Sequence, residues 1–358
     1  MRVMGWPAFS AKRNPFNSQL YTALQRLGVD VVDHSARQLW RADFDVLHVH
    51  WPNFDWPRGA LRRGARWWLT MHALAVPAAL LWAKARGRQV VWTIHNVQSH
   101  DAQFPRLARL YDRFLTYLVD AHISLSEAAR EVAVQRFPRL RRLRSFVIPH
   151  GHYRHAYPAR VDRLCARREL ALPETARILL FFGNVRRYKN VPALVRAAAE
   201  CVGDGVWLVV AGGPFDRMVR DEVRGAAEGA RNVRLFLDVI PEDRVHTFFS
   251  AADCFINPAD TLLNSGSSIL ALSFGVPVIA PDTPATRDLL RIVGGRFVYS
   301  YTGEIRAAVI REAMTSIAAP AATDEIPGLL KPLDWEPIAE RTRDAFSVLI
   351  AGKHRRAG

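Results

Sequence analysis

A run of small polar residues stands directly before an apolar stretch in the second half of the chain. Ser and Asn are common helix N-cap residues, and Gly lets the backbone approach a ligand closely. The free N–H groups and the dipole at such a helix start bind phosphate well. Taken alone, the run is better explained as an ordinary helix cap. The run consists of Asn264, Ser265, Gly266, Ser267 and Ser268.

Basic residues lie in a loop that follows an earlier predicted strand of the same half. The loop runs from Gly183 to Asn190 and contains Arg186 and Lys189. Arg offers a planar fork of donors and Lys a point charge, and both suit a diphosphate. Gly212 opens a tight turn after the next strand, which leaves room for a base or a sugar. The loop matches neither a GxGxxG pattern nor a Walker loop.

These features together describe a diphosphate site, because ligands of parallel sheets bind at the carboxyl ends of the strands. A nucleotide sugar fits best, since its leaving group is a diphosphate whose developing charge these groups would stabilise. The predicted donor-binding residues are Gly183, Arg186, Lys189, Gly212, Asn264, Ser265, Gly266, Ser267 and Ser268.

Histidines and an aspartate follow two predicted strands of the first half. His50 and His95 each lie at the end of a strand, and Asp101 follows His95 shortly after. An imidazole or carboxylate within hydrogen-bond reach takes a proton from an attacking hydroxyl. For each residue taken singly a polar loop is the more common explanation, so His50, His95 and Asp101 are alternative candidate bases. His48 shares a strand face with His50, but no third ligand stands at a metal-site spacing.

The loop Pro7–Phe16 follows the first predicted strand and is expected to contact a substrate. Asp43-Phe44-Asp45 resembles a metal-binding DxD pattern, but it precedes its strand, at the amino end of the sheet. We therefore predict no metal ligand and no cofactor besides a nucleotide-sugar co-substrate. The predicted acceptor-binding residues are Lys12, Arg13 and Asn14 in the loop after the first strand, and Asn96 after the strand Gln89–His95.

Strands and helices that alternate along the chain must position these residues. This alternation predicts an α/β protein with parallel sheets covered on both faces, arranged as two Rossmann-like domains that face a cleft. We expect an N-terminal acceptor-binding domain over 1–158, a C-terminal nucleotide-sugar-binding domain over 159–334, and a terminal helix in 335–358 able to cross back. The predicted strands are Arg2–Trp6, Val29–His34, Val46–Trp51, Gln89–His95, Ala121–Leu125, Phe146–Pro149, Ile178–Phe182, Val206–Ala211, Val233–Leu237, Cys254–Asn257 and Val276–Ala280.

One long stretch, Trp67–Ala83, contains no charged residue and has Arg and Lys on both sides. It is shorter than the ~20 apolar residues of a spanning helix, and it contains His72 and Pro77. Two interpretations stay open: a buried crossover helix, or an interfacial helix on an anionic membrane leaflet. The tryptophans, the basic flanks and a second basic run at Arg139–Arg144 favour the interfacial helix.

The formal net charge of +15 is concentrated in the first half. Residues 1–160 contain 24 Lys and Arg against 10 Asp and Glu, whereas residues 161–358 contain 25 against 24. This asymmetry indicates an anionic partner: nucleic acid, an anionic membrane or a phosphorylated acceptor. No stacking-aromatic or helix-turn-helix pattern supports nucleic acid. Three scattered cysteines and the absence of a secretory signal predict a cytoplasmic protein.

Segments along nearly the whole chain resemble the GT-B glycosyltransferases, and more closely the β-mannosyltransferase family of xanthan-type exopolysaccharide assembly. The more specific segments are His50-Trp51-Pro52, His150-Gly151-His152-Tyr153 and the RxYK pattern at Arg186–Lys189. The others are Asn14-Pro15-Phe16, Gln19-Leu20-Tyr21, Asp45–Val49, Thr93–Val97, Phe182-Gly183, Asn264-Ser265-Gly266, Leu270–Ser273, Pro277-Val278 and Ala280-Pro281.

The resemblance implies an enzyme at the inner face of the cytoplasmic membrane that uses GDP-mannose and a polyprenyl-diphosphate-linked oligosaccharide. It also implies inversion at the anomeric carbon and no divalent metal, and it adds His152 to the acceptor-binding residues. The large, retaining family 4 usually has two glutamates in the C-terminal stretch, where Leu262 and Leu270 stand here. That departure favours the mannosyltransferase family.

Two other classes of function remain open. One is a retaining, family-4-type transferase with another donor such as UDP-glucose, which the anomeric configuration of the product distinguishes. The other is a protein without catalytic activity, either a basic nucleic-acid- or membrane-binding protein on the same scaffold or a transferase relic with a dead site. The sequence leaves open the sugar, the nucleobase, the acceptor glycan, the linkage and the oligomeric state.

Overall fold

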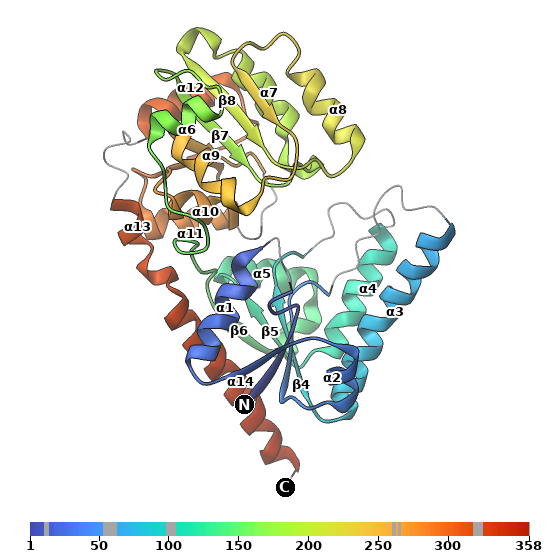
Figure 1. Cartoon of the computed structure of the whole chain (residues 1–358). Helices are drawn as coiled ribbons and strands as arrows, with labels where there is room; N and C mark the ends of the chain where they lie inside the picture. The colour runs from blue at the N-terminus through green and yellow to red at the C-terminus, as the bar shows by residue number, and fades with distance from the viewer. Residues whose placement is uncertain are drawn as a thin grey trace. The chain divides into compact units, whose positions relative to one another are not determined.

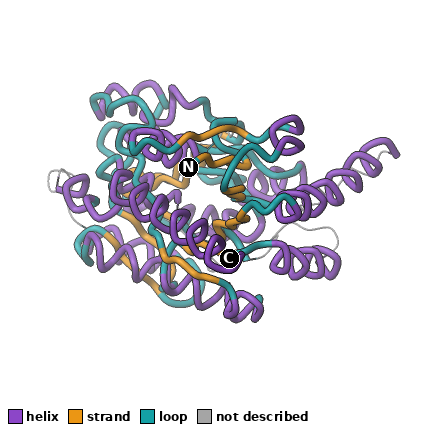
Figure 2. Tube along the Cα trace, turned by 90° about the horizontal axis from the view of Figure 1, so that it is seen from below, coloured by secondary structure: helices purple, strands orange, loops and turns teal. Residues whose placement is uncertain are grey.

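The chain divides into two compact units, one formed by Met1–Gly151 with Leu333–Gly358 and the other by His152–Pro332. The computed structural model describes residues 1–10, 14–52, 63–97, 105–259, 263, 266–317 and 325–357. Each unit holds a six-stranded parallel sheet with helices between its strands (Figure 1). In Figure 2 the helices, in purple, flank the strands, in orange. The chain is thus an α/β protein, as expected.

The sheet of the first unit has the strand order β2-β1-β3-β4-β5-β6, and all of its neighbouring strands run parallel. The central strands β3, β4 and β5 are almost wholly buried, because helices cover both faces of a parallel sheet. The elements are β1 (Arg2–Trp6), α1 (Pro15–Arg26), β2 (Asp30–Asp33), α2 (Ala36–Arg41), β3 (Val46–Val49), α3 (Arg63–Ala85), β4 (Gln89–Ile94), α4 (Pro105–Leu118), β5 (Ala121–Ser124), α5 (Glu127–Arg136), the 3-10 helix η1 (Pro138–Arg142), β6 (Arg144–Val147) and α14 (Trp335–Ala357).

The C-terminal helix α14 packs against α1 and completes the core of the first unit. Trp335, Ile338, Phe346 and Leu349 lie in one buried cluster with side chains of α1 and of the sheet. Figure 1 shows α14 running beside α1. The first unit therefore needs two separate segments of the chain.

The sheet of the second unit has the strand order β12-β11-β10-β7-β8-β9, again parallel throughout. Its edge strand β12 was not expected from the sequence, because the run Val298–Tyr301 is short and two of its four side chains are only partly buried. The elements are α6 (Arg163–Glu169), β7 (Arg177–Phe182), η2 (Arg187–Lys189), α7 (Val191–Ala199), η3 (Val202–Asp204), β8 (Val206–Ala211), α8 (Arg217–Ala226), β9 (Val233–Phe236), η4 (Glu242–Arg244), α9 (Val245–Ala251), β10 (Cys254–Ile256), α10 (Gly266–Ser273), β11 (Val278–Pro281), α11 (Pro284–Val293), β12 (Val298–Tyr301), α12 (Ala307–Ser316), α13 (Ile326–Leu329) and η6 (Lys331–Leu333).

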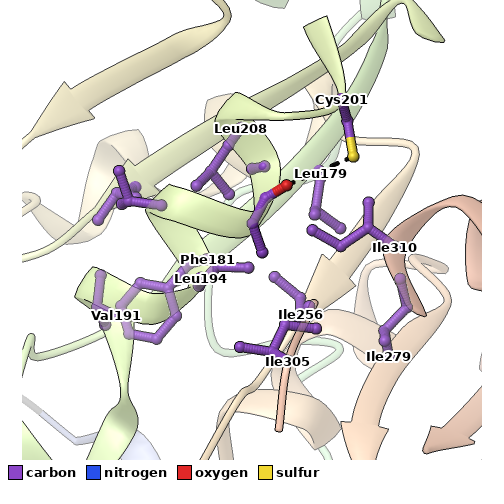
Figure 3. Close-up of a cluster of buried hydrophobic side chains, with 14 of the residues drawn as sticks. Leu179, Phe181, Val191, Leu194, Cys201, Leu208, Ile256, Ile279, Ile305 and Ile310 are labelled. Carbon is purple, nitrogen blue, oxygen red and sulfur yellow. Dashed lines mark hydrogen bonds between the residues drawn. The ribbon is translucent and has the colours of Figure 1, made fainter. Parts of the chain in front are cut away.

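One face of this sheet is sealed by a cluster of aliphatic and aromatic side chains (Figure 3). Leu179 and Phe181 of β7 and Leu208 of β8 pack there against Leu194 of α7 and Ile310 of α12. This packing fixes the orientation of the strands. The loops at their carboxyl ends are held in place as a result.

The uncharged stretch Trp67–Ala83 forms most of α3, which connects β3 to β4. Val76, Leu80 and Ala83 of this helix are buried, which agrees with the interpretation as a crossover helix. Leu74 and Leu81, by contrast, are exposed. Within the described part of the chain, no helix is long and apolar enough to cross a membrane.

Candidate active site

A chain of hydrogen-bonded side chains lies at the carboxyl ends of β3 and β4 in the first unit. The hydroxyl of Tyr21, from α1, lies 2.9 Å from Nδ1 of His48 and 2.9 Å from Nε2 of His50. Nε2 of His48 lies 2.7 Å from Oγ1 of Thr93. Nδ1 of His50 lies 3.0 Å from Nε2 of His95. Five side chains are thus linked from Thr93 to His95.

The protonation states along this chain depend on one another. Tyr21 has a single hydroxyl proton, so it donates to one of its two imidazoles and accepts an N–H from the other. A neutral imidazole donates from one nitrogen and accepts at the other, so the tautomer of His50 determines which role remains for His95. A change in the hydrogen bonding of His95 is therefore felt at Tyr21 and His48.

Burial keeps these imidazoles neutral. It lowers the pKa of His48 to about 3 and the pKa of the neighbouring His150 to about 4. Burial, then repulsion from His48 and His95, lowers the pKa of His50 well below its ordinary value. Burial, followed by His150 and His48, does the same for the pKa of His95. At neutral pH the cluster therefore presents neutral hydrogen-bond donors and acceptors and adds no positive charge.

Aromatic rings enclose the histidines. The ring centroid of Phe16 lies 4.9 Å from that of His95 and 4.7 Å from that of His150. Trp51 stacks on His95 at 4.4 Å, and Trp335 of α14 lies 5.3 Å from Phe16. Such packing holds an imidazole in one orientation.

The loop after β1 is positioned by Asp33, at the end of β2. Its carboxylate accepts backbone hydrogen bonds from Ala8, Phe9 and Ser10 at 2.7 to 2.9 Å. Burial acts to raise the pKa of Asp33, but the bonds from Ala8, Ser10 and Phe9 outweigh it and leave this pKa lowered. This loop leads into the predicted acceptor-binding residues.

The predicted catalytic bases differ in their burial and in their hydrogen bonds. His50 is fully buried, and both of its ring nitrogens are hydrogen-bonded within the protein. Direct proton transfer from a substrate to His50 is therefore disfavoured by its contacts. His95 is half-buried, and its Nε2 joins it to the hydrogen-bonded chain through His50. Asp101 lies outside the described residues.

The predicted acceptor-binding residues are more scattered. Asn96 is exposed next to His95. Asn14 caps α1, where its side-chain oxygen accepts from the Phe16 N–H at 3.0 Å. His152 was expected in the N-terminal domain, but it is the first residue of the second unit and is buried there. His150, two residues earlier, belongs to the histidine cluster instead. Lys12 and Arg13 lie outside the described residues.

In the second unit, two glycine turns interlock at the carboxyl ends of the neighbouring strands β7 and β8. Gly183 has a φ of 122° and Gly212 a φ of 143°, and L side chains rarely adopt either value. A Cβ atom at Gly212 would lie 2.1 Å from the carbonyl oxygen of Gly183. Only glycine lets these two turns approach each other.

The predicted cations stand directly above these turns. Nζ of Lys189 lies 5.5 Å from the ring centroid of Phe181. A Cβ atom at Gly183 would lie 3.3 Å from the same Nζ. Burial, and then repulsion from Arg186, lowers the pKa of Lys189 to about 8. The guanidinium of Arg186 lies 4.9 Å from the Phe215 ring centroid. The repulsion between Lys189 and Arg186 shows that the two cations are electrostatically coupled, and such a pair suits an anion.

Helix α10 begins at Gly266, at the carboxyl end of β10, which is the neighbour of β7. Ser267 is half-buried and Ser268 is buried in its first turn. The ends of β10, β7 and β8 therefore bring the described donor-binding candidates to one edge of one sheet. Asn264 and Ser265 lie outside the described residues. Among the residues that the structure does describe, no group of three or more His, Cys, Asp or Glu is placed to hold a metal ion.

Several members of the histidine cluster were not predicted as site residues. Tyr21 and Trp335 come from helices, and no local pattern signals that they approach the strand ends. Thr93 resembles an ordinary buried strand residue. His48 did give a signal, because it lies on the same strand face as His50 and a buried pair of imidazoles requires partners.

Comparison with known proteins places the chain among glycosyltransferases. Residues 162–323 match the family described as glycosyl transferases group 1. Over 331 residues the chain is 27% identical to the GDP-mannose:glycolipid 4-beta-D-mannosyltransferase of Xanthomonas campestris pv. campestris, a match that covers 92% of this chain and 87% of that protein.

Solved structures share the fold. HepE of Anabaena in complex with UDP-glucose matches with a TM-score of 0.71 at 14% identity and covers 97% of this chain and 100% of its own. Sucrose-phosphate synthase of Thermosynechococcus elongatus matches with a TM-score of 0.68 at 16% identity and covers 98% and 100%. Residues 162–323 thus form a domain of the glycosyl transferases group 1 family, and the chain is a glycosyltransferase with the GT-B fold.

Proposed function

We propose that the protein transfers mannose from GDP-mannose to a lipid-diphosphate-linked oligosaccharide in exopolysaccharide assembly, with inversion and without a divalent metal. The observation that carries this proposal is the 27% identity, over 92% of the chain, to a GDP-mannose:glycolipid 4-beta-D-mannosyltransferase. The leucines at positions 262 and 270 support it, because a family-4 transferase usually has glutamates there. The enzyme acts, on this proposal, at the inner face of the cytoplasmic membrane.

The second unit binds the donor. Lys189 and Arg186 neutralise the diphosphate, and backbone N–H groups at the N-terminus of α10 bind the same anion. Gly183 and Gly212 let the nucleotide approach the backbone. The developing charge on the leaving diphosphate is stabilised by these groups, which lowers the barrier to transfer.

The first unit binds the acceptor and receives its proton. Asn14 and Asn96, with Lys12, Arg13 and His152, are the candidate contacts to the acceptor. His95 is the preferred base among the described candidates, because it is half-buried, whereas His50 is fully buried with both ring nitrogens hydrogen-bonded. The deprotonated hydroxyl displaces GDP in one in-line step. Asp101 remains the alternative base.

Thermal unfolding with a panel of nucleotides tests the donor. GDP and GDP-mannose are expected to stabilise the protein by about 2.7 kcal/mol at one hundred times their Kd, whereas UDP, ADP and UDP-glucose give little shift. NMR of the product then gives its anomeric configuration, and EDTA tests the need for a metal. Stabilisation by UDP-glucose with a retained configuration would replace this proposal with the family-4 alternative.

Alanine variants test the donor site itself. Lys189→Ala and Arg186→Ala are expected to weaken GDP binding and turnover together, while circular dichroism shows an intact fold. Arg217→Ala, on the exposed face of α8, is the matched control for loss of one cation. Variants of Lys189 and Arg186 that keep wild-type rates would remove these residues from the diphosphate site.

A further inference from the structure

Helix α4 exposes an apolar stripe on the outer side of the first unit. Leu107, Leu110, Phe114 and Tyr117 follow one another at a spacing of three to four residues, so they lie on one side of the helix. Leu107 is 51% exposed and Leu110 is 65% exposed. The opposite side of α4 is buried in the unit through residues such as Leu115. Apolar residues that recur in this way on a solvent face mark an interaction site.

Helix α3 extends the same surface. It packs side by side with α4 (Figure 1). Leu74 and Leu81 of α3 are exposed, and so are Ala75, Ala78 and Ala85. Trp82 adds an aromatic edge, where it stacks on Trp40 of α2 at 4.7 Å. We define the α3–α4 surface by its exposed residues Leu74, Leu81, Leu107, Leu110, Phe114 and Tyr117.

The helices that form and flank this surface have many basic residues and few acidic ones. The described side chains of α2, α3, α4 and η1 include nine Lys and Arg but a single carboxylate, Asp112, which is buried. Arg139 of η1 lies 4.5 Å over the Tyr117 ring, and Arg86 lies 5.3 Å over the Trp82 ring. The first unit as a whole has 27 Lys and Arg against 14 Asp and Glu, whereas the second has 22 against 20.

We infer that the α3–α4 surface docks the protein onto an anionic lipid bilayer. Exposed leucines and aromatics enter the boundary between headgroups and acyl chains, and the surrounding arginines bind anionic headgroups. A second copy of this chain is a poorer occupant, because two such cationic surfaces repel each other. This inference rests on the proposed function, in that a lipid-linked acceptor lies in a membrane. It assigns that contact to both helices, with α4 carrying the larger apolar stripe.

Vesicle flotation tests the surface in the absence of donor and acceptor. The full chain is expected to float with phosphatidylcholine vesicles that contain phosphatidylglycerol, to float less in high salt, and to stay unbound with phosphatidylcholine alone. Leu107→Gln/Leu110→Gln should weaken binding about tenfold or more, because both apolar contacts are lost. The matched control is Val202→Gln/Met218→Gln in the second unit, whose side chains are 56% and 63% exposed.

A charge-reversal pair separates electrostatic from apolar binding. Arg106→Glu/Arg113→Glu on α4 should weaken binding to the anionic vesicles by ~tenfold or more, since each arginine near the surface contributes about a factor of five. Arg217→Glu/Arg306→Glu in the second unit changes the net charge equally and should bind like the wild type.

Three results would overturn the inference: a wild-type chain that does not bind anionic vesicles, control pairs that lose as much binding as the α4 pairs, or a dimer in sedimentation that the α4 variants abolish. The last result would make a second copy the occupant. GDP-induced stabilisation, measured on every variant without vesicles, separates this inference from the proposed function. If an α4 variant loses vesicle binding but keeps GDP binding, its defect lies in the α3–α4 surface and not in the donor site. If the wild-type chain binds vesicles but transfers no mannose, the proposed function is wrong and the inference about the surface stands.

Discussion

Lys189 gives the proposed donor site a pH dependence that is unusual for a lysine. Burial and Arg186 lower its pKa from 10.5 to about 8, so the free protein loses this charge as the pH rises through 8. A diphosphate binds the protonated form, and GDP affinity is therefore constant well below pH 8 and falls above it, approaching about tenfold per pH unit. Titration of GDP binding by calorimetry between neutral and alkaline pH measures this fall.

The variant Lys189→Arg is the control for this titration. A guanidinium stays charged throughout the range, so the decrease above pH 8 should disappear even if the affinity itself changes. Lys189→Ala should bind weakly at every pH. An unchanged decrease in Lys189→Arg would mean that another group titrates, and the assignment to Lys189 would be wrong.

Tyr21 is expected to act on turnover through the histidines. Tyr21→Phe removes one hydroxyl and leaves Nδ1 of His48 and Nε2 of His50 without this partner in a fully buried position. We expect a loss of about 1–3 kcal/mol in the free energy of unfolding. We also expect a lower kcat with unchanged GDP affinity, because His95 is no longer held in one tautomer. Urea unfolding and steady-state kinetics measure the two effects.

A structural effect alone would leave a different signature. Tyr117→Phe, at an exposed tyrosine of the same unit, should change neither stability nor kcat in a detergent-free assay with a water-soluble acceptor analogue. If Tyr21→Phe lowers stability but leaves kcat and its pH profile as in the wild type, Tyr21 supports the fold and takes no part in positioning His95.

Residue type and strand position were enough to anticipate some of these groups but not their contacts. His50 and His95 lie at the ends of predicted strands and Arg186 and Lys189 follow one, and parallel sheets bind their ligands at these ends. Tyr21 and Trp335 reach the histidines from α1 and α14. That approach depends on helix packing between segments far apart in sequence, which no local pattern encodes.

At the scale of elements, the contact between the glycine turns after β7 and β8 can be tested by a single substitution. In Gly212→Ala the new Cβ meets the Gly183 carbonyl oxygen, and the backbone φ of 143° is strained for alanine. We expect a loss of more than about 1 kcal/mol in the free energy of unfolding, together with weaker GDP binding, because both turns must shift. Chemical denaturation and GDP titration are the measurements.

Gly225→Ala supplies the matched substitution. Gly225 lies inside α8, and nothing lies within 4 Å of an added Cβ. Alanine is a better helix former than glycine by about 1 kcal/mol, so this variant should be as stable as the wild type or more so. Equal losses in both variants would show that the contact between the two turns is not the cause.

The elements themselves were largely predictable, with instructive exceptions. A continuous run of apolar residues predicts buried strands such as Val206–Ala211. The edge strand β12 lacks such a run, because it is short and two of its four side chains are only partly buried. The sequence of α3 was compatible with both a buried core helix and an interfacial helix. The structure gives it a buried side and an exposed apolar side, so the two interpretations do not compete.

At the scale of the whole molecule, the two units differ in how the chain builds them. The second unit is continuous from His152 to Pro332, whereas the first needs α14 from the far end of the chain. That asymmetry was visible in the sequence only as a terminal helix with no strand after it. The stabilising partner of α14 is the face of α1, and this pairing is a property of the folded first unit.

A fragment experiment follows from this arrangement. Residues 152–332 should fold alone, with one cooperative unfolding transition, and should bind GDP with nearly the affinity of the full chain. Residues 1–151 should not fold alone, because Trp335, Ile338, Phe346 and Leu349 leave the core. Each buried side chain of this size contributes about 1.5–3 kcal/mol, and four of them match the whole stability of a typical domain.

Addition of a peptide covering 333–358 should restore structure to residues 1–151, measured by circular dichroism. A stably folded 1–151, or a 152–332 fragment that folds but ignores GDP, would contradict the assigned roles of α14 and of the second unit respectively.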